Sequence, residues 1–177
     1  MKVASSDATE MEAVIGNSKS KLAEQIAALP LRRDAKGRLS VLMVTSRETG
    51  RWVMPKGWEM DGKKPWAAAE IEALEEAGAV GHISTTEIGT YRYVKKLDNG
   101  KGVPCRVTVY PMVVDRLKTN WKERHQRKRK WFSPPSAAKR VHEPELRDLL
   151  LTLDTKNPVK SLPKEIRKKM KNTQFDE

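Results

Sequence analysis

Apolar and polar positions along the chain predict both strands and helices. Apolar runs bounded by turn residues predict five strands, over residues 39–44, 52–54, 86–96, 106–114 and 130–132. Helices are predicted over residues 19–29, 65–77, 136–141 and 145–153. Pro30 ends the first of these helices, and Pro144 divides the last two. Because strands and helices alternate, a mixed sheet between helical layers is the natural packing, which is an α/β fold.

The chain has 177 residues, a length that predicts one folded domain with tails. We expect an N-terminal extension over residues 1–29, which is polar up to residue 18 and partly disordered before the short helix. The folded domain is expected to span residues 30–153. Residues 154–177 are predicted to form a basic C-terminal tail, with a cluster of lysines near its end.

The chain carries 35 Lys and Arg residues against 23 Asp and Glu residues, a net charge of +12. This excess predicts an anionic partner, but it does not separate a small phosphate ester from a nucleic acid or a membrane surface. No apolar segment has the length of a membrane span, and no apolar signal region follows Met1, so no membrane partner is expected. Cys105 stands alone, which excludes an intrachain disulfide and favours a reducing cytoplasm. The oligomeric state does not follow from the sequence.

The predicted helix over residues 65–77 is acidic within a basic protein. It contains no Lys or Arg, and its acidic residues are Glu70, Glu72, Glu75 and Glu76. The last three stand at i, i+3 and i+4 and share one helix face, where like charges destabilise a helix by roughly 0.2–0.5 kcal/mol per pair. A divalent cation, Mg²⁺ or Mn²⁺, would offset this repulsion, because such hard cations prefer carboxylate oxygens.

Residues 57–79 resemble the Nudix box, whose pattern is Gly, five residues, Glu, seven residues and then Arg-Glu-U-x-Glu-Glu-x-Gly-U, where U is aliphatic. The matching positions are Gly57, Glu72, Glu75, Glu76 and Gly78. Lys63 replaces the first Glu of the pattern and Ile71 replaces the Arg, both at positions that are largely structural in the family. The resemblance implies a Nudix-type α/β/α sandwich with a mixed sheet, flanked by the polar N-terminal and basic C-terminal extensions.

Segments outside the box resemble the diphosphoinositol polyphosphate phosphohydrolase subgroup, and the likeness covers residues 31–150. It implies that Glu59 lies near the metal, together with the three glutamates of the box. The substrate-binding residues that it implies are Lys36, Arg38, Ser46, Arg47, Lys56, Gly57, Arg106 and Arg127. Glu143 departs from the subgroup, which has a basic residue near that place. This departure argues against the most highly phosphorylated substrates.

These features predict a hydrolase in which water attacks a phosphoanhydride. Glu72, Glu75 and Glu76 are the expected catalytic residues and metal ligands, and Glu75 or Glu76 would double as the general base. The expected partner is a small anionic polyphosphate of the diphosphoinositol polyphosphate or diadenosine polyphosphate class, and nucleic acid is not favoured. Two alternatives stay open: an RNA 5′ pyrophosphohydrolase, and a catalytically silent Nudix module that binds nucleotides or RNA.

Overall fold

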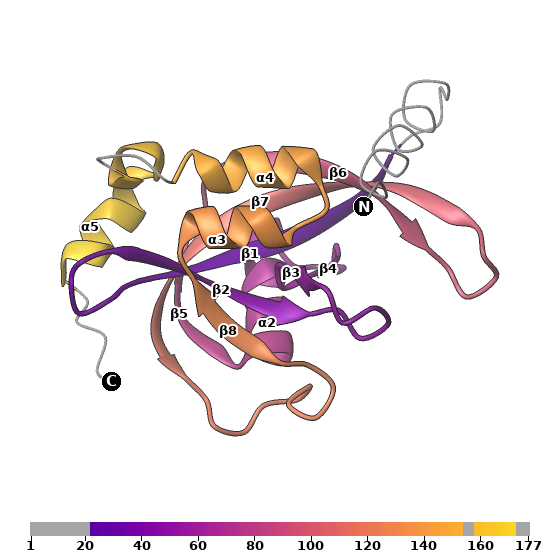
Figure 1. Cartoon of the computed structure of the whole chain (residues 1–177), viewed down its shortest axis with the longest axis horizontal. Coiled ribbons are helices and arrows are strands. Elements are labelled where there is room, and N and C mark those ends of the chain that lie inside the picture. The colour runs from indigo at the N-terminus through magenta and orange to yellow at the C-terminus, as the bar shows by residue number, and fades with distance from the viewer. Residues whose placement is uncertain (1–21, 154–157, 173–177) are drawn as a thin grey trace.

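The computed structural model of the protein describes residues 22–153 and 158–172, and its centre is a mixed sheet of eight strands (Figure 1). The strands are β1 (Ala23–Arg33), β2 (Leu39–Thr45), β3 (Trp52–Val53), β4 (Lys56–Trp58), β5 (Ala79–Ile83), β6 (Gly89–Lys96), β7 (Gly102–Leu117) and β8 (Arg129–Phe132). The main path of the sheet runs β3-β2-β1-β7-β5, while β4 pairs with β1, β6 with β7 and β8 with β2. β1 and β7 are parallel, and the other described pairs are antiparallel.

Helices cover both faces of this sheet (Figure 1). They are α2 (Pro65–Ala77), α3 (Pro134–Arg140), α4 (Pro144–Leu151) and α5 (Lys164–Asn172), with a 3₁₀ turn, η1 (Pro158–Ser161), before α5. α2 packs on the face that carries Ile26 and Ala28 of β1, whereas α3 and α4 pack on the face that carries Ala27 and Leu29. This division follows from the alternation of side chains along a strand. The predicted α/β/α sandwich is therefore confirmed.

The helix predicted over residues 19–29 is wrong for residues 23–29, which belong to β1; residues 19–21 lie outside the described residues. β1 is a central strand that is buried on both faces, and burial in the sheet outweighs helix propensity. Pro30 does not interrupt the strand. It falls between residues 25–27, which pair with β4, and residues 31–33, which pair with β2, so the proline leaves no ladder bond unmade there.

The other predicted strands correspond to β2, β3, β6, β7 and β8, and the other predicted helices to α2, α3 and α4. The sequence pattern misses β4 and β5, which are short and each contain a glycine, Gly57 and Gly81. It also misses α5, whose apolar residues Ile166 and Met170 are buried in the core beneath a basic outer surface. Part of the segment predicted as a tail thus packs on the domain, against β5 and β7.

The structure also shows the state of Cys105 and the length and apolar character of the helices. Cys105 is a free, buried cysteine of β7. Across the described ranges, no helix has both the length and the apolar character that a membrane crossing requires.

Candidate active site

Helix α2 presents its glutamates in its C-terminal half, and the sequence fixes both of its ends. Pro65 occupies the first turn, where a missing N–H leaves no bond unmade, and Gly78 adopts the left-handed conformation (φ 63°) that ends the helix. Trp121 Nε1 donates a hydrogen bond to the Glu76 carbonyl (3.1 Å), and Arg129 Nη1 donates one to the Ala77 carbonyl (2.8 Å). These bonds satisfy terminal carbonyls and hold the end of the helix that carries the glutamates.

Glu72 lies directly against strand β4 at Gly57. A Cβ atom at Gly57 would stand 2.2 Å from Glu72 Oε1 and 2.5 Å from its Cδ. Any side chain at this position would therefore displace the carboxylate. The close approach of β4 to α2 requires this glycine, and it explains why the two motif positions, fifteen residues apart in the sequence, belong together.

Glu76 is buried and held by two donors. Arg127 Nη2 donates a hydrogen bond to its Oε1 (3.2 Å), and the Lys56 backbone N–H donates one to its Oε2 (3.4 Å). The side chains of Glu76 and Arg127 are 7% and 9% exposed, so this ion pair is shielded from solvent. Arg127 Nη1 also donates to the Thr45 carbonyl (3.0 Å), which ties α2 to the end of β2.

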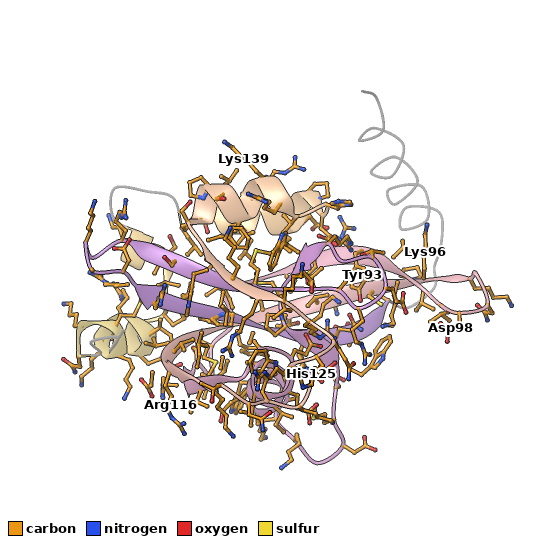
Figure 2. All side chains as sticks on the ribbon, turned by 60° about the horizontal axis from the view of Figure 1, so that its bottom comes forward. Tyr93, Lys96, Asp98, Arg116, His125 and Lys139 are labelled. Atoms are coloured by element: carbon orange, nitrogen blue, oxygen red, sulfur yellow. The ribbon has the colours of Figure 1, made fainter. Side chains whose placement is uncertain are left out.

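Glu123 is a further buried carboxylate at this site, and the sequence patterns do not single it out. Arg127 Nη2 and Arg47 Nη1 lie 3.3 and 3.4 Å from its Oε1. Its backbone N–H donates to the Glu75 carbonyl (3.1 Å), which fixes the loop before β8 against α2. Figure 2 shows this loop, marked by His125, beside the helix. The available signal was a lone Glu four residues before Arg127 in a basic loop, which is ion-pair spacing.

The carboxylates share one electrostatic environment. Burial raises the pKa of Glu72, and the charges of Glu75 and Glu123 raise it further. Burial raises the pKa of Glu76 to about 7; the Arg127 guanidinium opposes this rise and the Glu72 charge adds to it. The two side chains interact: the charge of Glu72 raises the pKa of Glu76, whereas the Glu76 side chain lowers that of Glu72. A proton or a cation would offset the repulsion between two such carboxylates.

Glu72 and Glu76 therefore fit a divalent cation, because they interact and their carboxylate oxygens are the ligands that hard cations prefer. Glu75 also acts on Glu72 through its charge, but its side chain is 34% exposed and its Oε1 lies 3.3 Å from Lys122 Nζ. Within residues 22–153 and 158–172, no three His, Cys, Asp or Glu side chains form a ready metal centre. The structure thus brings two of the three box glutamates together and directs the third to a lysine.

Several predicted substrate-binding residues adjoin these carboxylates. Lys56 and Gly57 contact Glu76 and Glu72 through their main chain, as described above, and Arg127 pairs with Glu76. Arg47 Nη1 donates a hydrogen bond to Gln126 Oε1 (3.1 Å) and lies beside Glu123. The neighbouring Ser46 hydroxyl is 2.5 Å from Thr49 Oγ1 within the β2–β3 turn.

Lys36 and Arg38 lie far from this group. They belong to the turn between β1 and β2, where Arg38 Nε pairs with Asp34 Oδ2 (2.8 Å). Arg127 binds the opposite end of β2, at Thr45, and seven residues of extended strand span about 20 Å. The resemblance implied that this turn binds substrate, but β2, which follows it, separates the turn from Thr45 and Arg127.

Glu59 and Arg106 have other described partners than the carboxylate pair. Glu59 is exposed, and its charge contributes to raising the pKa of Tyr110, after burial and the charge of Glu87. Arg106 is exposed on β7 and pairs with Glu24 of the neighbouring strand β1. Neither residue makes a described contact with Glu72 or Glu76.

A second group of charges lies on the other face of β4, and we call it the Arg51 cluster: Arg51, Lys56 and Glu143. Glu143 is 5% exposed and its Oε1 lies 2.7 Å from Arg51 Nη2. Lys56 Nζ lies 5.0 Å from the Tyr93 ring centroid. Burial lowers the pKa of Lys56, while the charges of Glu76 and Glu143 oppose that shift. Lys56 thus stands between the two groups of charges.

Comparisons with known proteins point to one family. A family model described as the NUDIX domain matches residues 23–153. Nudix hydrolase 16 of Arabidopsis thaliana, described as mitochondrial, is 32% identical over 117 residues, which are 64% of this chain and 64% of that protein. Diphosphoinositol polyphosphate phosphohydrolase 3-alpha of Homo sapiens is 30% identical over 108 residues, 59% of this chain and 62% of that protein. The matches thus span less than two thirds of each of these relatives.

Among solved structures, an Ap4A hydrolase of C. elegans superposes with a TM-score of 0.56 at 20% identity, covering 76% of this chain and 97% of that one. At this identity the likeness establishes the fold. The family match establishes more than the fold, because the matched residues include the carboxylate helix α2, strand β4 and the loop that carries Arg127. The chain belongs to the NUDIX domain family.

Proposed function

We propose that this protein is a metal-dependent pyrophosphohydrolase that cleaves a phosphoanhydride in a small polyphosphate. The observation that carries the proposal is the interaction between Glu72 and Glu76, a half-buried and a buried carboxylate on one helix face whose pKa values are both raised. Members of the Nudix family generally use divalent metals, and a divalent cation would relieve this repulsion. The names of relatives support the substrate class, since they include a diphosphoinositol polyphosphate phosphohydrolase and an Ap4A hydrolase.

A bound Mg²⁺ or Mn²⁺ ion would supply charge neutralisation and a more acidic water. Glu72 and Glu76 are the proposed ligands, and Arg127 orients Glu76 for this role through its bond to Oε1. Glu75 adjoins the pair and is partly exposed, so it can accept a proton from water and pass it to solvent. Glu75 is therefore the proposed general base, since Glu76 is enclosed between Arg127 and the Lys56 main chain.

Cations beside the carboxylates would bind the substrate phosphates. Arg47 is exposed next to Glu123, and an exposed guanidinium suits bidentate contact with phosphate. Lys56 lies between Glu76 and Glu143, where its ammonium would act as a point charge. Arg38 and Lys36 are too far from Glu76 to share this role.

The test is phosphate release from a panel of anhydrides: a diphosphoinositol polyphosphate, a diadenosine polyphosphate and a nucleoside diphosphate sugar. We expect release from at least one member with Mg²⁺ or Mn²⁺, and none in EDTA. Substrate that is cleaved equally well in EDTA would contradict the metal proposal. An inert protein that nevertheless binds the panel would favour the silent module.

Removal of pyrophosphate from RNA 5′ ends is a second candidate, and α5 favours it. The outer surface of this helix exposes Lys164, Lys168 and Lys171, and it lies at the end of the molecule remote from β4 in Figure 1. Such a surface could bind an RNA chain whose 5′ end occupies the site. Affinity for triphosphorylated oligonucleotides would then rise with length and fall steeply with salt. A small-polyphosphate enzyme would show neither dependence.

The silent-module alternative rests on the two departures from the box. Lys63 is exposed and Ile71 is half-buried on α2, so both residues are accommodated without an unpaired buried charge. The carboxylates that would hold the metal are all retained. These two facts favour the enzyme.

Experiments can determine the cellular compartment and the oligomeric state of the protein. The cytoplasmic location predicted from Cys105 stays a prediction, and five relatives from Arabidopsis thaliana are described as mitochondrial. Fractionation of the source cells and light scattering of the purified protein would determine the two properties.

A further inference from the structure

Helix α5 carries a row of cations that no described carboxylate neutralises. Its sequence, Lys-Glu-Ile-Arg-Lys-Lys-Met-Lys-Asn, has five basic residues and one acidic residue. We call four of the basic residues the α5 ridge: Lys164, Arg167, Lys168 and Lys171. Among residues 22–153 and 158–172, no carboxylate forms an ion pair with the ridge, whereas Arg92 and Arg106 of the sheet are paired with Glu145 and Glu24.

The opposite side of the helix holds this ridge in place. The ridge residues stand at i, i+3, i+4 and i+7, so they share one helix face. Ile166 and Met170, on the far side, are 0% and 4% exposed in the core. Glu165, the one acidic residue of the helix, accepts hydrogen bonds from Ser84 Oγ (2.5 Å) and from the Thr85 backbone N–H (2.8 Å). The packing of α5 therefore turns its acid toward the domain and its cations outward.

Solubility alone does not require a row of this kind. Like charges at i, i+3 and i, i+4 destabilise a helix, and a solvated helix face gains support when it alternates charges of both signs at this spacing. The α5 ridge has no acidic residue among its cations, so the repulsion between them stays unrelieved within the helix. An anionic partner that lies along the ridge would offset this repulsion.

The turn between β1 and β2 adds positive charge at the same end of the molecule. Its basic residues are Arg33, Lys36 and Arg38, and its one acid, Asp34, is bound to Arg38. Figures 1 and 2 both show this turn and α5 at the end of the molecule opposite the β6–β7 hairpin. Leu31 and Leu39, which flank the turn, belong to the same core cluster as the buried side of α5. We call the α5 ridge and residues 33–38 together the basic end.

The chemistry of the basic end favours a duplex phosphate backbone over other anionic surfaces. A helix that binds a membrane inserts apolar side chains, and the apolar residues of α5 face the core instead. Sites for single-stranded nucleic acid stack bases on aromatic side chains, and neither α5 nor residues 33–38 contain one. Recognition of duplex RNA also uses its 2′-hydroxyl groups, whereas the ridge offers charged groups only. Duplex DNA presents two rows of phosphates, which cations bind without contact to the bases.

We propose that the basic end binds the phosphate backbone of duplex DNA without reading its sequence. This binding function goes beyond the proposed hydrolase, because it does not use Glu72 or Glu76. It also differs from the RNA-end candidate, because no chain end has to enter the candidate active site. The two surfaces are separate in the fold: the basic turn and Arg127 lie at opposite ends of β2.

The test is fluorescence anisotropy of a labelled DNA duplex titrated with the full chain between about 50 and 200 mM salt. The duplex carries 5′-hydroxyl ends, so it holds no phosphoanhydride for the hydrolase site. The logarithm of the affinity should fall linearly with the logarithm of the salt concentration, because each neutralised phosphate releases counterions. Lys164→Gln/Lys168→Gln removes two ridge cations. It should make this slope shallower by about 2 and weaken binding at low salt about tenfold or more.

Lys96→Gln/Lys101→Gln is the matched control. Both lysines are exposed in the β6–β7 hairpin, so the change removes the same charge at the other end of the molecule and should leave the slope unchanged. Thermal unfolding checks that both double variants are folded.

Three outcomes would overturn the inference. The wild type fails to bind the duplex, the two double variants weaken binding equally, or an RNA duplex, a single strand or phosphatidylserine vesicles bind more tightly than the DNA duplex. Phosphate release from the anhydride panel tests the hydrolase separately, so each proposal can fail alone.

Discussion

Strand β4 separates two groups of charges that are balanced in opposite ways. On the α2 face, Glu72, Glu76 and Glu123 meet one buried cation, Arg127. On the other face, the Arg51 cluster sets two cations against one carboxylate, with Trp58 beside it. The first face has too much negative charge and suits a metal ion. The second has one more cation than anion, and an exposed indole lies beside it.

Three consecutive residues of β4 face the two groups of charges in turn. Gly57 faces Glu72 because it lacks a side chain, while Lys56 and Trp58 on either side of it turn to the opposite face. The Lys56 backbone N–H nevertheless bonds Glu76, so one residue joins the two faces. Changes on the α2 face should therefore affect turnover, and changes on the other face should affect the choice of ligand.

The largest effect is expected for Glu76→Gln. It removes a proposed ligand while keeping an acceptor for Arg127, so we expect turnover to fall at least about a hundredfold, as for other electrostatic elements of active sites. Stability without metal should rise, because repulsion with Glu72 is relieved. Phosphate release and urea denaturation measure the two quantities. Glu70→Gln is the control, since Glu70 is exposed on the same helix and should change neither. Wild-type turnover in Glu76→Gln would refute the assignment.

Gly57→Ala should affect the α2 face alone. The new Cβ would meet Glu72 Oε1 at 2.2 Å, and a flexible carboxylate can move aside without unfolding the protein. We expect a stability loss below about 1 kcal/mol, because Ala otherwise suits a strand at least as well as Gly. Metal affinity and turnover should both fall about tenfold or more, as for displaced ligand geometry.

A double variant sharpens this prediction. If the clash with Glu72 is the cause, Gly57→Ala should cost no further metal affinity in a Glu72→Ala background. Calorimetric titration with Mn²⁺ measures the coupling of the two sites. Additive losses would show that Gly57 acts through another contact.

The pH dependence of the free energy of unfolding should reflect the burial of Glu76 and its repulsion from Glu72 and Glu123. In the folded protein, Glu76 faces Glu72, Glu123, Arg127 and the Lys56 ammonium, and its pKa is raised to about 7. The folded state therefore binds more protons than the unfolded state between its ordinary pKa of 4.5 and about 7. The free energy of unfolding therefore falls as the pH rises over this range. The stabilising contribution of Glu76 is complete below pH 4.5 and is lost as the pH rises through 7.

Denaturation in EDTA at pH 5.5 and pH 8 tests this sign. Between pH 5.5 and pH 8, the free energy of unfolding of the wild type should fall by roughly 2 kcal/mol more than that of Glu76→Gln. This figure leaves out the coupling between Glu76 and Glu72. Added Mn²⁺ should restore the wild type at pH 8. Equal pH profiles for the two proteins would show that the ionised Glu76 is not destabilised in the folded protein, which would contradict its raised pKa.

The carboxylate helix could be predicted from the sequence because its signals are local. Pro65 and Gly78 mark its ends, and the spacing of Glu72, Glu75 and Glu76 defines one face. β1 could not be predicted in the same way. Its residues 23–29 suit a helix, and they form a strand because β4 and β7 pair with its two edges and helices cover both faces of the sheet, which is a property of distant segments.

The site itself was predictable only in part for the same reason. Glu72 and Glu76 follow from the motif, but Glu123 enters through the fold of the loop before β8, and a helical wheel cannot show that Lys122 engages Glu75. The basic residues were the hardest to place. Lys36 carries the positive charge that a phosphate contact needs. Whether such a cation reaches Glu76, however, depends on which end of β2 it occupies.

The smallest effects are expected for variants of these basic residues. The variants compare a cation at one end of β2 with a cation at the other end. Arg47→Ala removes an exposed guanidinium next to Glu123, within reach of a phosphate at the carboxylates, so KM for the substrate should rise about fivefold to tenfold, as for loss of one charge-assisted contact. Arg38→Ala removes the same charge about 20 Å away and should leave KM unchanged, because ions screen exposed charges beyond about 8 Å. Both variants lower the net charge by one, so a general electrostatic effect would move them together. Steady-state kinetics at 0.15 M salt decide the matter. A rise in KM for Arg38→Ala equal to that for Arg47→Ala would mean that the substrate extends along the whole of β2, and would return the basic turn of residues 34–38 to the site.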